Sequence, residues 1–349
     1  MKFYQGFCVI FSITVLSACS SVGYYSQSAM GQLSLWWNAE PISDLLEDEA
    51  TNAQLKQRLQ QVLEIRRFAS ERLALPDNDS YREYVALDRP YVVWNVVAAP
   101  ELSLQMHEWC FPIVGCLRYR GYFAEADAQA LGQEMRQQGL DVAVYGVAAY
   151  STLGWFDDPM LSTILKRNEA ALAGLVFHEL AHQQLFVKGD TAFNEGFAKT
   201  VEIVGVQRWL QQRNSPELNQ AFAKRQKLRK EFLQLVAATT KKLRQLYASS
   251  LSDEQKRQGK ADIIAVMHQE YAQLKQSWGG DDRYDKWFAK DVNNARLGAV
   301  ATYQDYVPAF TRLLEQNRND LSAFYQAAAA IGDLDKDERS KAIEALLSE

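Results

Sequence analysis

The chain has no excess of positive charge. Its formal net charge is −5 over 349 residues, whereas a protein that binds nucleic acid needs a basic surface to contact the phosphates. We therefore expect no nucleic-acid partner. Hydrophobic residues make up 48% of the sequence and charged residues 23%, which is typical of a globular protein. A chain of this length can bury one large core or two modest ones.

The apolar run at the N-terminus is too short to cross a bilayer as a mature helix. It extends from Phe7 to Leu16 and follows a single basic residue, Lys2. Leu16-Ser17-Ala18-Cys19 then has the form of a bacterial lipobox. Residues 1–18 are therefore predicted to be a lipoprotein signal peptide, and a plain cleaved secretory peptide is the alternative.

Lipidation at Cys19 would attach a diacylglycerol to the thiol and make residues 19–41 a membrane tether. Ser20 follows the cysteine. In Gram-negative lipoproteins that resemble this segment, aspartate at that position favours the inner membrane. Ser20 therefore predicts the periplasmic face of the outer membrane.

Cysteine is scarce, with 4 in the chain. Removal of the signal peptide and lipidation of Cys19 leave Cys110 and Cys116. An oxidising compartment permits a disulfide between them, and a proline and a glycine help the intervening segment to turn. Two buried thiols are the alternative. A second metal site is not expected, because no Cys-x-x-Cys pattern or nearby histidine pair accompanies these cysteines.

Histidine is equally scarce, with 4 in the chain, yet two of them stand in His178-Glu179-Leu180-Ala181-His182. This is the H-E-x-x-H pattern of zinc peptidases, and chance would produce it about 10⁻³ to 10⁻² times in such a chain. On a helix, residues i and i+4 share one face, so both imidazoles can bind one ion. Glu179 is rotated by about 100° and can take a proton from a water that the ion activates.

A catalytic zinc needs a third protein ligand and an open fourth position. Glu195, thirteen residues after His182, is the best candidate, and Glu202 competes with it. Residues 188–191, Lys-Gly-Asp-Thr, supply the turn between two helices, because glycine suits a helix C-cap and Asp or Thr the next N-cap. The alternative is an ordinary buried helix with two hydrogen-bonded histidines.

The order of helical and strand patterns predicts an α+β, mostly helical fold. Strand-like runs occupy residues 91–98, 117–123 and 141–148. Helical spacing is found over residues 42–75, 124–139, 168–186, 192–212, 217–278 and from 307 onward. We expect one domain over residues 42–349, with a sheet-containing part (90–160), the metal-binding helices (161–212) and a helical region (213–349).

A small sheet directly before the H-E-x-x-H helix is similar to the arrangement in zincins. In zincins, the last strand before that helix lies at the edge of the cleft and pairs with an extended peptide, a general mode of peptide recognition. Residues 142–152 are therefore the candidate edge strand. A buried strand followed by a surface loop is the alternative.

The helical region contains a basic run between residues 217 and 278. A run of charge usually marks a solvated face, so a long solvated pair of helices is the preferred interpretation. Contact with an anionic membrane surface or polymer is the alternative.

Several motifs together resemble the predicted bacterial aminopeptidase family of lipoproteins. They are the lipobox, Trp109-Cys110-Phe111-Pro112-Ile113-Val114-Gly115-Cys116, Tyr119-Arg120-Gly121-Tyr122-Phe123, the H-E-x-x-H motif, Asn194-Glu195-Gly196-Phe197-Ala198 and Asn293-Asn294-Ala295-Arg296. Two histidines on one helix and a glutamate on the next are also similar to the gluzincins, the thermolysin-like metallopeptidases. This resemblance implies one zinc ion held by His178, His182 and Glu195, with Glu179 as the general base.

The sequence departs from these families at two points. Thermolysin-like proteins place an aspartate four residues after the ligand glutamate to orient a histidine, and here Lys199 stands at that position. Asp190 or Glu202 would have to orient the imidazole instead. The Gly-x-Met-Glu-Asn strand of well-known zinc aminopeptidases, whose glutamate holds a free amino terminus, is absent from the sequence.

The resulting hypothesis is zinc-dependent hydrolysis of peptide bonds in the cell envelope by an aminopeptidase. Tyr303 or Tyr150 would stabilise the oxyanion, and Asn294 would contact the substrate backbone. Two alternatives remain. One is an endopeptidase with one specific substrate, and the other is a lipoprotein that binds peptides or scaffolds partners through a non-catalytic metal site.

Overall fold

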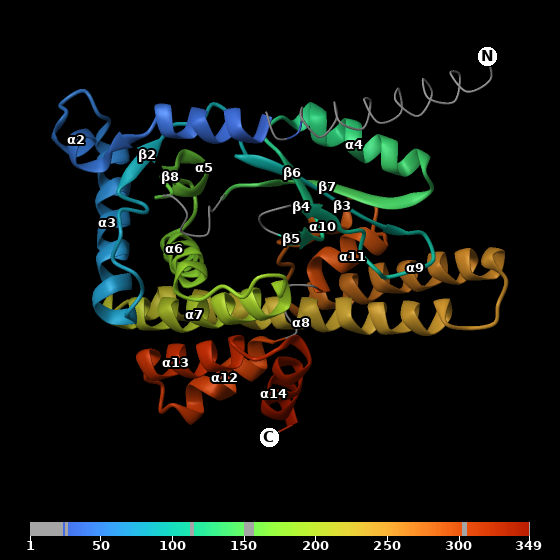
Figure 1. Ribbon diagram of the computed structural model, residues 1–349. Coiled ribbons are helices and arrows are strands. Elements are labelled where there is room, and N and C mark those ends of the chain that lie inside the picture. Colours follow the sequence, from blue (N-terminus) through green and yellow to red (C-terminus); the bar gives the residue numbers. More distant parts are fainter. Residues whose placement is uncertain (1–23, 25–26, 112–114, 150–156, 302–305, 349) are drawn as a thin grey trace, which may run out of the picture.

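The computed structural model describes residues 24, 27–111, 115–149, 157–301 and 306–348 (Figure 1). Helices predominate among them and the sheets are small, so the predicted α+β, mostly helical class is confirmed. The labelled helices are α2 (Ile42–Glu47), α3 (Ala53–Leu73), α4 (Glu125–Gln137), α5 (Ser162–Leu165), α6 (Glu169–Gln184), α7 (Thr191–Gln212), α8 (Pro216–Tyr247), α9 (Asp253–Ser277), α10 (Asp285–Phe288), α11 (Asn294–Ala301), α12 (Val307–Gln316), α13 (Leu321–Gly332) and α14 (Lys336–Ser348). The strands are β1 (Glu40–Pro41), β2 (Glu83–Val85), β3 (Val93–Pro100), β4 (Trp109–Phe111), β5 (Gly115–Leu117), β6 (Arg120–Tyr122), β7 (Leu140–Val147) and β8 (Met160–Leu161). None of the helices in these ranges has the length and apolar character that crossing a membrane requires.

The main sheet is antiparallel, with the strand order β6-β3-β7. Its central strand β3 is apolar along nearly all of its length because both faces are covered. Helix α4 packs on one face and α11 on the other (Figure 1). β3 and β7 confirm the strands predicted at residues 91–98 and 141–148, with small shifts of their ends. Among the described strands β7 pairs only with β3 in its sheet, so it is an edge strand. This agrees with the edge predicted at residues 142–152 as far as β7 reaches, and residues 150–152 lie outside the described ranges.

The strand predicted at residues 117–123 is divided in the structure. β5 pairs with β4 in a hairpin, whereas β6 pairs with β3, so the chain has to turn between them. Cys110 and Cys116 face each other across the hairpin and form a disulfide. A second sheet of order β1-β2-β8 was not predicted, because strands of two or three residues are too short to show an alternating pattern.

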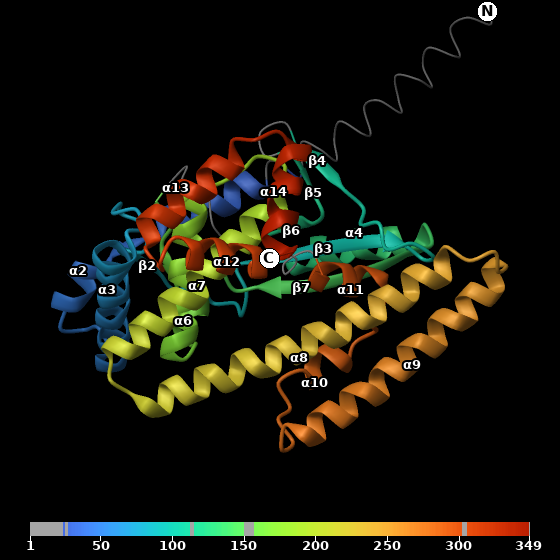
Figure 2. The same cartoon turned by 90° about the horizontal axis from the view of Figure 1, so that it is seen from below.

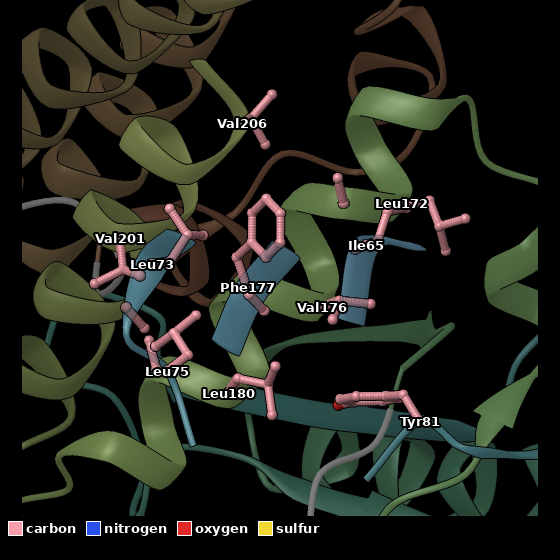
Figure 3. Packing of buried hydrophobic residues seen from close by; sticks show 14 of the residues in the cluster. Ile65, Leu73, Leu75, Tyr81, Leu172, Val176, Phe177, Leu180, Val201 and Val206 are labelled. Atoms are coloured by element: carbon pink, nitrogen blue, oxygen red, sulfur yellow. The ribbon is translucent and has the colours of Figure 1, made fainter. Parts of the chain in front are cut away.

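Helices α3, α6 and α7 pack around the largest apolar cluster (Figure 3). Phe177 of α6 is completely buried, with Leu73 of α3 beside its ring and Val206 of α7 above it in the view of Figure 3. Burial of one such side chain contributes about 1.5–3 kcal/mol. A Cβ at Gly205 would lie 2.7 Å from the Phe177 ring. This glycine therefore lets α7 approach α6 closely, which sets the distance between the two helices that carry the metal-binding motif.

The basic segment forms a long antiparallel hairpin of α8 and α9, which extends from the body of the protein (Figure 2). Its base is stabilised by an aromatic cluster in which Phe232 of α8 stacks on Tyr284 with ring centroids 3.9 Å apart. The predicted pair of long helices is thus confirmed. Helices α12–α14 lie on the opposite side of α7 from the main sheet (Figure 1).

The segment predicted as a tether contains a helix at residues 27–37 that docks on the domain. Leu35 is 3% exposed and belongs to the main core. Gly31, one turn earlier, lies against the ring of Phe123 so closely that a Cβ would come within 2.3 Å of it. Over residues 27–37 a docked helix therefore replaces the tether, because glycine and leucine four positions apart form one contact face.

Candidate metal centre

Helices α6 and α7 begin and end close to the predicted positions. Asn168 caps α6 by accepting a hydrogen bond from a backbone N–H of the first turn. Gly189 in the connecting turn has a φ of +78°, a left-handed conformation that glycine adopts without strain. Asp190 caps α7 by accepting from the backbone N–H of Phe193. Its second oxygen pairs with Nε of Arg339 at 2.8 Å, which ties α14 to this cap.

Asn194 fixes the turn beside Glu195. The Asn194 side chain is buried, and its Oδ1 accepts from the backbone N–H of Val187 at 2.7 Å. Its Nδ2 donates to the carbonyl of the same residue at 2.8 Å. These two bonds connect the first turn of α7 to the segment that follows α6. They therefore fix the position of Glu195 relative to the end of α6.

The side chains of His178, His182 and Glu195 converge. The two Nε2 atoms are 3.1 Å apart. Nε2 of His178 lies 3.4 Å from Oε2 of Glu195, and Nε2 of His182 lies 3.6 Å from Oε1. A tetrahedral site with metal–ligand bonds of about 2.0–2.1 Å has edges of about 3.3 Å. The three separations match these edges, so this group could hold one metal ion.

Within the described ranges, this is the one group of three histidine, cysteine or acidic side chains with such spacing. Glu202, which competed with Glu195 in the sequence, is not part of it. Three protein ligands leave one position of a tetrahedral site open for water or substrate. The predicted ligand set is thus brought together by the structure.

The charges of the three ligands depend on one another. Burial and the charge of His178 lower the pKa of His182 to about 4. Burial by itself would lower the pKa of His178 too, but the carboxylates of Glu195 and Glu202 outweigh it and raise that pKa to about 10. Burial opposes ionisation of Glu195, yet the two imidazoles lower its pKa below the ordinary value. A metal cation would replace the proton on His178, since ligand imidazoles bind in the neutral form.

Glu202 lies behind His178, beside the ring nitrogen that does not face the other ligands. Its Oε2 is 3.3 Å from Nδ1 of His178, close enough for an ion pair with the protonated imidazole. Its Oε1 is paired with Nζ of Lys199. Burial opposes ionisation of Glu202, but Lys199 and His178 lower its pKa to about 2. Of the two candidates, Glu202 is therefore the one that is placed to orient His178, whereas Asp190 is engaged by Arg339 and by the α7 cap.

We expect Glu202→Gln to weaken binding of a divalent metal ion at this group by about 10- to 100-fold, as loss of a group that orients a ligand usually does. The neutral amide would no longer attract the imidazole or fix which ring nitrogen carries the proton. Competition with a chromophoric chelator at neutral pH measures the affinity. Glu64→Gln is the matched control, because it breaks an exposed ion pair with Arg213 on the surface. Equal affinities of Glu202→Gln and the parent protein would show that Glu202 does not orient the ligand.

A polar turn braces the helix at the residue after His182. Nδ2 of Asn78 donates to Oε1 of Gln183 at 2.7 Å, and Nε2 of Gln183 is 3.2 Å from Oγ of Ser80. Arg66 stabilises the turn by donating hydrogen bonds to the carbonyls of Asn78 and Ser80. The sequence indicates only a turn at these residues, because nothing local connects it to a helix a hundred residues later.

Two tyrosines near the site are not singled out by the sequence. Tyr81 has a left-handed φ of 66° and is 1% exposed. Burial and then the charge of the partly exposed Glu179 raise its pKa. Burial likewise raises the pKa of Tyr145 on β7 to about 12, and the charge of Glu195 adds to the rise. Both hydroxyls therefore stay protonated at neutral pH. Tyr145 could have been found from the sequence, because it lies in the predicted edge strand.

The remaining predicted site residues have different outcomes. Tyr150, Tyr303 and Cys19 lie outside the described residues. Asn294 is fully buried, and the prediction that it contacts substrate is corrected. Its Nδ2 donates to the carbonyls of Pro100, Glu101 and Ser103, and its Oδ1 accepts from the hydroxyl of Tyr247. Both polar atoms of the side chain are engaged, so Asn294 holds the loop after β3.

With two histidines on one helix and a glutamate on the next, the protein has a candidate metal centre of the His-His-Glu type. The chain belongs to the family described as "putative aminopeptidase", whose model matches residues 23–343. No curated protein and no solved structure shows significant similarity to it. The match includes the main sheet, both ligand helices and the long hairpin.

Proposed function

We propose that the protein is a zinc-dependent peptidase and that the aminopeptidase activity named by its family resides at His178, His182 and Glu195. The observation that carries the proposal is the convergence of their ligand atoms at separations of 3.1, 3.4 and 3.6 Å. Two imidazoles and one carboxylate favour zinc, and three protein ligands with one open position are typical of a catalytic site.

Glu179 is the proposed general base and acid. A bound zinc ion would supply Lewis acidity and make a water at the open position more acidic. The Glu179 carboxylate accepts the proton of the attacking water and later delivers it to the leaving amine. Tyr150 and Tyr303 remain the oxyanion donors proposed from the sequence, and Tyr145 joins them because its protonated hydroxyl lies within range of the Glu195 charge.

The edge of β7 is the proposed binding place for an extended peptide. Val147 accepts a backbone hydrogen bond from the residue before β3, so its backbone groups face β3. By alternation, Val144 and Gly146 direct their backbone groups to the other edge. Asn293 covers the far end of that edge by donating to the carbonyl of Val142 at 3.2 Å. A substrate strand would therefore pair at Val144 and Gly146.

We also propose that the protein acts in the cell envelope as a lipoprotein. The lipobox that ends at Cys19 supports this location. The Cys110–Cys116 disulfide agrees with it, since disulfides persist mainly in oxidising compartments. The lipid would hold the domain at the periplasmic face of the outer membrane.

A peptide digest tests both the activity and its direction. Purified mature protein loaded with zinc is incubated with peptides of mixed sequence, each prepared with a free and with an acetylated N-terminus. We expect mass spectrometry to detect stepwise loss of N-terminal residues from the free peptides and no change in the acetylated ones. Internal cleavage of both forms would make the protein an endopeptidase. Absence of cleavage in both forms would overturn the peptidase proposal.

A further inference from the structure

The docked N-terminal helix, residues 27–37, presents an apolar stripe to the outside. Met30 is 61% exposed, Leu33 37% and Trp37 80%. Since each residue of a helix is rotated by about 100°, positions i, i+3 and i+7 fall within about 60° of one another. These three side chains, called the N-terminal stripe below, therefore lie on one face of the helix.

Contacts on the other side of the helix prevent the stripe from turning inward. Leu35 is buried in the main core, and Gly31 is pressed against the ring of Phe123. Earlier in the chain, the guanidinium carbon of Arg120 lies over the ring of Tyr24, 4.1 Å from the ring centroid. These contacts fix the rotation of the helix about its own axis. The N-terminal stripe consequently stays exposed while the domain is folded.

The surrounding sequence indicates what covers the stripe. Residues 3–39 contain no aspartate, glutamate, lysine, arginine or histidine, although charged residues make up 23% of the chain. No side chain in this stretch would therefore have to lose the hydration of a charge next to lipid. Tyr24, which is already helical, stands five residues after Cys19, so the chain between the two residues spans at most about 18 Å. Tryptophan is enriched where protein meets the headgroup layer of a bilayer.

We propose that the N-terminal stripe inserts into the membrane surface to which a lipidated Cys19 would anchor the chain, and that this contact orients the domain. The partner that covers the N-terminal stripe is thus one leaflet of a phospholipid bilayer. The N-terminal helix and helices α12–α14 lie on opposite sides of the molecule, with α6 and α7 between them (Figure 1). The C-terminal helices would accordingly point away from the bilayer, and the ligand helices would be held at a set height above it.

Vesicle co-sedimentation tests this contact without the lipid anchor. The mature chain with Cys19→Ser is mixed with vesicles of phosphatidylethanolamine and phosphatidylglycerol. We expect Leu33→Glu combined with Trp37→Glu to reduce the bound fraction at least about ten-fold, because two carboxylates would have to be desolvated. The matched control combines Leu251→Glu with Leu334→Glu, two side chains that are 43% and 36% exposed elsewhere on the surface. It should bind as the parent protein does.

The outcomes separate the membrane from other occupants. Equal binding by the parent and the stripe variant, or no binding by either, would overturn the proposal. A parent that is a dimer without vesicles and a stripe variant that is a monomer would make the stripe an interface between copies, and the membrane contact would be wrong. A fluorescent label on Leu33→Cys repeats the test without added charge. A quencher carried by the lipid should quench this label and leave a label on Leu251→Cys unchanged.

Discussion

Glu179→Gln should reduce peptide hydrolysis by about 10²–10⁴-fold, the usual contribution of a positioned general base. The amide has nearly the same shape as the carboxylate but cannot accept a proton from water. Glu179 is not one of the three converging ligands, so the metal content should remain at the level of the parent protein. The measurements are kcat on a peptide with a free N-terminus and the zinc content per chain by mass spectrometry.

The control for this experiment is Glu254→Gln, which changes a carboxylate that is 91% exposed in the α8–α9 hairpin. Its activity should equal that of the parent protein. If Glu179→Gln cleaves as fast as the parent, Glu179 is not the general base and the proposed mechanism fails. If its zinc content falls together with its activity, Glu179 acts as a ligand instead.

His182→Ala should remove both the metal and the activity. His182 is 6% exposed, and its Nε2 lies 3.1 Å from Nε2 of His178, so no other part of the described chain replaces it in the ligand group. Two remaining ligands should hold zinc too weakly to survive dialysis. Zinc content should fall well below one ion per chain, and added zinc at concentrations that saturate the parent should not restore hydrolysis.

Thermal unfolding gives an independent measurement of the same loss. A metal that binds only the folded state raises Tm, so a chelator should lower Tm of the parent and have no effect on His182→Ala. His268→Ala is the matched control, because His268 packs edge-on against Phe288 near the long hairpin and not at the site. It should retain zinc, activity and the response to chelator. Full zinc content in His182→Ala would refute the assigned ligand set.

The long elements of this protein could be predicted because their burial imposes a period on the sequence. α6 and α7 show helical spacing and end at recognisable caps, and β3 is an apolar run because α4 and α11 cover its two faces. The short sheet β1-β2-β8 could not be predicted, since two or three residues carry no period. The helix at residues 27–37 was missed because serine, glycine and glutamine interrupt its apolar residues, and the exposed Met30, Leu33 and Trp37 do not follow a single buried face.

Polar contacts between distant segments were the other feature that could not be predicted from the sequence. Asn294 stands in a motif that resembled a substrate contact, yet its amide binds three carbonyls that lie almost two hundred residues away in the chain. The brace between Asn78 and Gln183 likewise joins distant segments, since the two residues are 105 positions apart. Hydrogen bonds of this kind leave no periodic trace, because either partner is an ordinary polar residue in its own segment.

That His178 and His182 share one helix face could be predicted from the sequence, because a spacing of four residues fixes that geometry locally. The same helix geometry puts Glu179 next to them, rotated by about 100° from His178. The packing of α7 against α6, in contrast, distinguishes the two glutamates: Glu195 joins the candidate ligand group, and Glu202 lies beside the other ring nitrogen of His178. Both carboxylates lie on α7, seven residues apart, and their roles depend on how α7 is placed against α6. The Asn194 brace across the connecting turn and the close packing of Gly205 on Phe177 set that placement, and neither contact follows from the period of a single helix.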